Sequence, residues 1–172
     1  MKIIIIGNLG SGKSTLARKV QAQTQLPLLQ LDTLWHTTDY SDAAQECFLA
    51  QQQQFMRQPD WIIEGNYKGS LKQRVVQADL IIWLKVSRSK AVYRVIKRSL
   101  RFKRSRRSRP EMPAGFSEHF DQDYWAFLKT VWAYDNAGIE RLVVTNKRAS
   151  CQLLVLKTSK AKKRFLSHLQ RD

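Results

Sequence analysis

The stretch Gly7-Asn8-Leu9-Gly10-Ser11-Gly12-Lys13-Ser14-Thr15 fits the phosphate-binding pattern GxxxxGK[ST] at every fixed position. It directly follows the apolar run Ile3–Ile6, which is typical of a buried strand, and it opens a segment with helical character. Glycines let the backbone approach a phosphate closely and point its N–H groups inward. The positive end of the helix dipole adds to this attraction. We therefore expect Lys13 to reach the β- and γ-phosphates of a nucleotide, and the Ser14 hydroxyl to bind Mg²⁺.

Outward from this loop, predicted strands alternate with predicted helices. We expect strands at Lys2–Ile6, Leu28–Leu31, Trp61–Ile63, Leu80–Val86 and Leu153–Leu156. We expect helices from Lys13 to about Gln23, from a cap at Ser41 or Asp42 to about Gln58, from Ser70 to Gln77, from a cap at Ser117 onward, and from Ser159 to Leu169. The triplet Leu142–Val144 favours a strand. This alternation predicts an α/β fold with a parallel sheet covered on both faces.

Length and composition exclude several other classes of protein. The 172 residues favour a single domain, 1–172, and the aromatic content excludes a disordered chain. No apolar run reaches the roughly 18 residues of a transmembrane helix, and Ile3–Ile6 is far shorter than a signal-peptide core. We expect a cytoplasmic protein with no membrane partner. Cys47 and Cys151 form no CxxC pair and are predicted to pack as small apolar residues.

Basic charge is concentrated in one part of the chain. Thirty basic residues face fourteen acidic ones, and the formal net charge is +16. The segment from Arg88 to Arg109 carries many of the basic residues and no acidic residue. In its first half, Val92, Ile96 and Leu100 are spaced to line an inner helix face, with a cationic stripe of Arg94, Lys97, Arg98 and Arg101 beside it. Such a helix suits an anion site, whereas Lys103–Arg109 has no apolar period and is predicted to be an exposed loop.

Four segments resemble the adenylate-kinase-like P-loop kinases, and within them the topology modulation (FlaR-type) family: Gly7–Thr15, Leu31–Trp35, Trp61–Tyr67 and Tyr93–Arg101. The resemblance covers nearly the whole chain. It implies a P-loop NTPase three-layer α/β/α fold with a five-stranded parallel sheet of order 2-3-1-4-5, and a basic lid at about 99–118. It also implies ATP and Mg²⁺ as ligands. The family name refers to DNA topology and leaves the phosphoryl acceptor open.

Two acidic residues end predicted strands, where ligands of open parallel sheets bind. Asp32 follows the second strand and is a candidate catalytic residue, which would accept a proton from a hydroxyl acceptor or hold a Mg²⁺-bound water. The alternative is a plain helix or turn cap. Glu64 ends the third strand and is a candidate for Mg²⁺ support or acceptor binding, with a simple strand-end charge as the alternative.

Near these acids lie further candidates for acceptor binding, namely Trp35, Asn66, Tyr67 and Arg74. The aromatic rings would stack on a base or sugar, or would only fill the core. Arg74 would grip an acceptor phosphate, because a guanidinium suits bidentate contact, or would be an ordinary surface arginine. No arginine lies between Arg18 and Arg57, which weakens the case for a nucleoside monophosphate acceptor and leaves room for an uncharged one.

The transferred phosphoryl group needs positive charge, and Arg94, Arg98 and Arg101 are the candidates to supply it. Together these features predict an ATP-dependent kinase acting on a small nucleoside-like or other hydroxylated molecule. The alternative is a nucleotide-responsive nucleic-acid-binding protein that affects DNA topology through Lys103–Arg109 and has little kinase activity.

Overall fold

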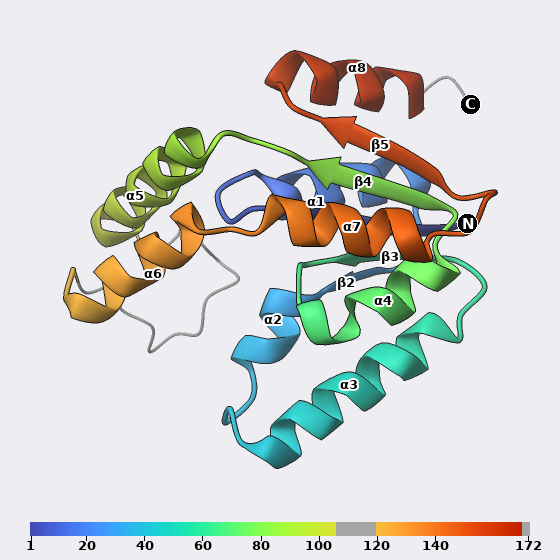
Figure 1. Cartoon of the computed structure of the whole chain (residues 1–172), viewed down its shortest axis with the longest axis horizontal. Coiled ribbons are helices and arrows are strands. Elements are labelled where there is room, and N and C mark those ends of the chain that lie inside the picture. Colours follow the sequence, from blue (N-terminus) through green and yellow to red (C-terminus); the bar gives the residue numbers. More distant parts are fainter. Residues whose placement is uncertain (106–119, 170–172) are drawn as a thin grey trace.

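A computed structural model describes residues 1–105 and 120–169 of the chain. At its centre is a five-stranded parallel sheet of order β2-β3-β1-β4-β5. The strands are β1 (Lys2–Gly7), β2 (Leu28–Gln30), β3 (Trp61–Glu64), β4 (Leu80–Leu84) and β5 (Gln152–Leu156). Helices cover both faces of the sheet (Figure 1). The expected three-layer α/β/α architecture and its strand order are confirmed.

The two faces of the sheet are buried against different helices, because alternate residues of each strand point to opposite sides. Ile3 and Ile5 of β1 pack with α1 (Lys13–Thr24) and α8 (Ser159–Leu169). Ile4 and Ile6 face the opposite layer. That layer comprises α3 (Asp42–Met56), α4 (Lys68–Gln77) and α7 (Asn136–Asn146). This double burial explains why the central strands are apolar without interruption.

Beyond the carboxyl ends of the strands, α5 (Arg88–Arg104) and α6 (Gln122–Trp132) pack on one another and form a smaller core of their own (Figure 1). The short α2 (Leu31–His36) lies between β2 and α3. In 1–105 and 120–169, no helix combines the length and the apolar composition needed to cross a bilayer.

The inner face of α5 differs from the expected one by about one residue. The structure buries Ala91, Val95, Ser99 and Phe102. Leu100, which was expected to face the core, is 55% exposed. This face meets the loop after β1 closely: a Cβ at Gly10 would come within 2.6 Å of the Ala91 carbonyl oxygen, so the approach depends on a glycine at position 10. Because Phe102 is buried, the helix continues through Lys103 and Arg104, which were expected in a loop.

Residues 142–144 form part of a helix, so the expected strand is wrong. The Asp135 carboxylate caps α7 by accepting a hydrogen bond from the Gly138 amide at 2.8 Å. Ile139 and Val143, four residues apart, are buried against the sheet, whereas Val144 is 57% exposed. A cap and one buried face therefore override the local β preference of these side chains.

Other expected details are confirmed or corrected by local hydrogen bonds. Ser41 caps α3 as expected, accepting from the Ala44 amide at 3.1 Å. Ser70 lies inside α4 rather than at its start, and its hydroxyl donates to Gln52 at 2.8 Å. At α8 the capping hydroxyl belongs to Thr158 instead of Ser159. Cys151 is buried as expected, but Cys47 is exposed on α3.

Part of the expected lid falls outside the described residues. Within 99–118, only residues 99–105 are described, and they lie in or directly after α5. The arginines at 106, 107 and 109 and the expected cap Ser117 fall within 106–119. The helix that follows, α6, is capped by Asp121, which accepts from the Tyr124 amide at 3.0 Å.

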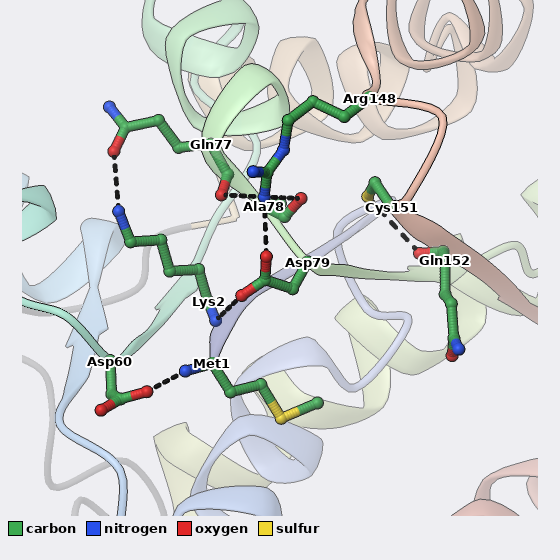
Figure 2. Close-up of polar contacts among 9 residues, drawn as sticks. All are labelled: Met1, Lys2, Asp60, Gln77, Ala78, Asp79, Arg148, Cys151 and Gln152. Carbon is green, nitrogen blue, oxygen red and sulfur yellow. Dashed lines mark hydrogen bonds and ion pairs between the residues drawn. The ribbon is translucent and has the colours of Figure 1, made fainter.

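At the amino-terminal edge of the sheet, polar contacts join β1, β4 and the loop before β5 (Figure 2). The Asp79 carboxylate accepts from the Lys2 amide at 2.7 Å and from the Arg148 guanidinium at 2.6 Å. The same guanidinium donates to the carbonyls of Gln77 and Ala78. Partial burial by itself would raise the pKa of Asp79, but these hydrogen bonds and the charge of Arg148 outweigh it and lower the pKa.

The lowered pKa of Asp79 predicts a small acid-sensitive contribution to stability. Since the folded-state pKa lies below the unfolded value of about 3.9, the contribution is present above that value and is lost as the pH falls through the folded pKa. Asp79→Asn is expected to lower the free energy of unfolding at pH 7 by less than about 1 kcal/mol, because the pair is exposed. Urea titrations of both proteins between pH 2 and 7 should show this difference shrinking at the acidic end. A constant difference would contradict the expectation.

Candidate active site

The loop between β1 and α1 is built to receive an anion. Gly10 and Gly12 adopt positive φ angles of 73° and 88°, a conformation that favours glycine. Gly12 is the residue before α1, and no side chain caps that helix. The first amides of α1 are therefore left for a ligand at the positive end of the helix.

The Lys13 side chain is folded back across this loop. Its Nζ donates to the Asn8 carbonyl at 3.4 Å, and the residue is only 6% exposed. Ser11 and Asn8 are buried beside it. The structure thus brings the expected phosphate-binding residues of 7–15 into one loop, with a buried ammonium group at its centre.

Two asparagines hold the loop from its flanks. The Asn8 amide donates to the Val131 carbonyl of α6 at 2.9 Å. Asn66, expected among the acceptor-binding residues, accepts at Oδ1 from the Gly7 amide at 3.1 Å and from the Tyr134 hydroxyl at 3.3 Å. Both side chains connect the loop to neighbouring elements, a structural role that the residue types alone did not indicate.

Glu64 is the last residue of β3 and is fully buried. Its Oε2 accepts from Gln30 at 3.3 Å, while Oε1 has no partner among the described residues. Burial raises the pKa of Glu64, and so does the nearby Asp32, whereas Lys13, Gln30 and the Ser14 hydroxyl oppose this shift. The structure therefore groups Lys13, Ser14, Asp32 and Glu64, as the sequence predicted.

Asp32 lies near Glu64, but it does not end a strand as expected. The strand β2 stops at Gln30, and Asp32 is in the first turn of α2. Leu31, the first residue of α2, is fully buried beside Gly65, where an added Cβ would lie 2.8 Å from the Leu31 Cβ. Asp32 still faces Tyr67, and its charge contributes to the environment of both Tyr67 and Glu64.

The pair Ser14 and Glu64 fits a hard cation that prefers oxygen ligands. A buried carboxylate oxygen without a partner, close to a serine hydroxyl, is the chemistry that Mg²⁺ requires. Within the described part of the chain, no group of three or more His, Cys, Asp or Glu residues could hold a metal alone. Mg²⁺ here would need ligands from water and from substrate phosphates, which is its habit in phosphate-binding sites.

An aromatic cavity of about 200 Å³ opens beside this group. Its lining comprises Trp35, Gln45, Phe48, Leu49, Tyr67, Lys68, Gly69 and Ser70. The Trp35 and Tyr67 rings, expected from the sequence, lie 6.4 Å apart between centroids, and Phe48 lies 5.2 Å from Trp35 and 4.9 Å from Tyr67. Burial raises the pKa of Tyr67, as do the charges of Asp32 and Glu64, so its hydroxyl stays protonated. Phe48, on α3, was not among the residues that the sequence singled out for the site.

Arg74 is fully buried, and its guanidinium binds the backbone of the adjoining loop. Nη1 donates to the Gly65 carbonyl at 2.8 Å, and Nη2 donates to the carbonyls of Asn66 at 2.7 Å and Tyr67 at 3.0 Å. Burial lowers the pKa of Arg74 to about 10, although Glu64 opposes the shift. These contacts hold Tyr67 in its unusual backbone conformation, with a φ of 25°.

Arg74→Lys is expected to lower the free energy of unfolding by about 2–4 kcal/mol, because buried carbonyls lose charge-assisted donors that an ammonium cannot replace in the same geometry. Urea unfolding at neutral pH measures this change. Arg57→Lys, at an exposed position after α3, is the matched control and should change stability little. Equal stability of the two variants would show that the carbonyl contacts are dispensable.

Of the three candidate arginines on α5, Arg94 lies at the loop. Its Nη1 is 3.4 Å from the Ser11 carbonyl oxygen, to which it donates. Arg98, one turn further, is half-buried, and Arg101 is exposed. The helix thus places one of these cations beside the phosphate-binding loop and the others progressively further along its axis.

Comparison with known proteins supports the fold. No family model matches the chain, and no curated protein gives a significant sequence match. Several solved structures are similar over nearly the whole chain. A shikimate kinase from Acinetobacter baumannii has a TM-score of 0.58 at 10% identity, covering 99% of this chain and 90% of its own. A deoxyadenosine kinase from M. mycoides has a TM-score of 0.54 at 16% identity, covering 100% of both chains.

A gluconokinase from Sinorhizobium meliloti is also similar, with a TM-score of 0.52 at 13% identity, covering 99% of this chain and 91% of its own. At these identities the similarity shows the fold alone, which this chain shares with the three kinases. The phosphate-binding loop of this chain occupies the position expected in such a fold, between β1 and α1.

Proposed function

We propose that this chain is a kinase that transfers the γ-phosphoryl group of Mg·ATP to a hydroxyl group of a small molecule. The observation that carries the proposal is the juxtaposition of three features: the loop 7–14 with its buried Lys13, the partnerless Glu64 oxygen near Ser14, and the aromatic cavity beside Asp32. The structural neighbours named as shikimate kinase, gluconokinase and deoxyadenosine kinase support the same class of reaction.

Each group of residues has a part in the proposed reaction. The loop amides and Lys13 hold the phosphates, and Arg94 neutralises the transferred group. Ser14 and Glu64 would hold Mg²⁺. A bond forms between the acceptor oxygen and the γ-phosphorus, and the bond from that phosphorus to the bridging oxygen of ADP breaks. The hydroxyl proton passes to the Asp32 carboxylate. Bound Mg²⁺ would offset the negative charge of the phosphates.

The cavity favours an uncharged acceptor with a flat ring, such as a nucleoside. Three aromatic rings line it, and among the described lining residues there is no arginine that could hold an acceptor phosphate. Lys68, the cation in that lining, is paired with Asp135 at 3.2 Å. Arg74, the expected phosphate ligand, binds backbone carbonyls instead. We therefore assign Arg74 and Asn66 a positioning role, and Trp35 and Tyr67 the direct contact with the acceptor.

The decisive experiment measures transfer from γ-labelled Mg·ATP to a panel of nucleosides, nucleoside monophosphates and small hydroxylated metabolites. A labelled product that is absent with Lys13→Ala supports the proposal, and a nucleoside product supports the acceptor class. ATP binding without any labelled product would overturn the kinase proposal. The affinity for duplex DNA at increasing salt would then test the alternative of a nucleic-acid-binding protein related to the topology modulation family, since such binding weakens steeply with salt.

A further inference from the structure

The C-terminal helix α8 brings a lysine into the phosphate-binding loop. The Lys162 ammonium donates to the Ser11 carbonyl, and it lies 3.5 Å from the position that a Cβ would take at Gly12. It reaches the loop from the far end of the chain, on the helix that follows β5 (Figure 1). Arg94 donates to the same carbonyl from α5.

The position of Lys162 on α8 is unlike that of its basic neighbours. Ala161, Phe165 and Leu166 pack on the sheet and α1, and Lys162 lies on this inner side, half-buried. Lys160 and Lys163 on the same helix are exposed. An amphipathic helix would ordinarily place an apolar residue at such a position. The lysine is therefore directed at the loop, whereas the other basic side chains of α8 lie in solvent.

Lys162 is surrounded by positive charge. Burial lowers its pKa to about 8, and the charges of Arg94, Lys90 and Lys13 act in the same direction. Among the described contacts of Lys162 there is no carboxylate. The acids of the site, Asp32 and Glu64, interact instead with Tyr67 and Gln30. Cations from α1, α5 and α8 that converge on one loop repel one another unless an anion lies between them. The arrangement is thus complementary to a ligand with several negative charges.

We propose that Lys162 is a phosphate-binding residue of the nucleotide site, which exchanges the Ser11 carbonyl for a phosphate oxygen when a nucleoside triphosphate binds. The inference deepens the proposed function, on which it rests for the identity of the phosphate donor. The proposal gives α8 a role in binding the phosphates. The position of this helix after the last strand of the sheet did not indicate such a role.

The test compares Lys162→Met with the wild type and with Lys163→Met, the matched control on the exposed side of α8. Binding of ATP, of inorganic tripolyphosphate and of adenosine is measured by calorimetry on the full chain. Loss of one charge-assisted contact is expected to weaken ATP and tripolyphosphate binding about 10- to 100-fold in Lys162→Met. Adenosine binding should be unchanged, Lys163→Met should behave as wild type, and Lys162→Arg should retain most of the affinity.

A second readout separates ligand contact from a merely structural role. Because a bound anion raises the pKa of a neighbouring ammonium, the wild type should take up protons on binding ATP near pH 8, as measured by repeating the calorimetry in buffers of different ionisation enthalpy. This uptake should be smaller in Lys162→Met. Urea unfolding of each variant without ligand shows that the fold is retained.

The outcomes distinguish this inference from the proposed function. Equal or tighter ATP binding by Lys162→Met, with unchanged proton uptake, would overturn the role of Lys162 while leaving the kinase proposal standing. Failure of the wild type to bind either ATP or tripolyphosphate would overturn both. Selective loss of triphosphate affinity in Lys162→Met establishes the contact even if the acceptor is still unidentified.

Discussion

Lys13→Ala is expected to reduce phosphoryl transfer at least about 100- to 1,000-fold and to weaken ATP binding, while the fold is retained. The ammonium is buried at the centre of the loop and its described hydrogen bond is to the Asn8 carbonyl. An alanine removes this hydrogen bond and the contacts of the buried stem, but it also removes the cost of keeping an ammonium out of water. Loss of the charge relieves repulsion on Lys162, whose pKa Lys13 lowers, and takes away the attraction that opposes the raised pKa of Glu64.

Steady-state transfer rates, ATP affinity and urea unfolding of the same variant check this expectation. Lys19→Ala, on the exposed side of α1, removes the same charge from the same helix and should leave all three unchanged. We expect the urea midpoint of Lys13→Ala to stay close to that of the wild type, because these effects oppose one another. A Lys13→Ala protein that folds and still transfers phosphate at the wild-type rate would remove the basis for the proposed site.

Arg94→Met is expected to lower kcat by about 10³-fold or more, with a smaller effect on ATP affinity. An arginine that neutralises a transferred phosphoryl group contributes about 10³–10⁵ in rate, and methionine keeps much of the apolar stem while it removes the charge. Arg94 is favoured over its neighbours because its guanidinium donates to the Ser11 carbonyl in the loop.

The matched control for Arg94→Met is Arg101→Met, two turns further along α5 and exposed. Single-turnover rates at saturating ATP separate the chemical step from binding, and Arg98→Met completes the series. The expected order of loss is Arg94 first and Arg101 last. If the exposed Arg101 proved the most important of the three, the assignment of Arg94 would be wrong.

The sequence predicted best those elements that need particular residue types at fixed intervals along the chain. A loop that wraps a phosphate needs glycines at set intervals and a lysine at its end, so 7–15 could be identified from residue types alone. The strands buried on both faces were equally clear, because they are apolar without interruption. The strand order came from the resemblance to P-loop kinases, since no pattern along the chain specifies which strands are neighbours.

The features that were missed depend on partners distant in the sequence. The inner face of α5 includes a close backbone contact with Gly10, far earlier in the chain, which the hydrophobic pattern of α5 does not reveal. Arg74 is an exception: it was expected at an acceptor phosphate or at the surface, and it binds the nearby carbonyls of 65–67, which no residue type can mark as ligands. The contact of Lys162 could not be predicted from the residues around it, because the loop that it contacts lies about 150 residues earlier in the chain.

Asn66 has a consequence for how the two substrates influence each other. Its side chain accepts a hydrogen bond from Gly7, at the start of the phosphate-binding loop, while the next residue, Tyr67, lines the aromatic cavity. Under the proposed function, a shift of the loop on binding ATP would be transmitted through this asparagine to the cavity for the acceptor. Thermodynamic linkage is reciprocal, so whatever factor ATP applied to acceptor affinity, the acceptor would apply equally to ATP affinity. Asn66 would then be a short route for cooperativity between the two halves of the proposed site.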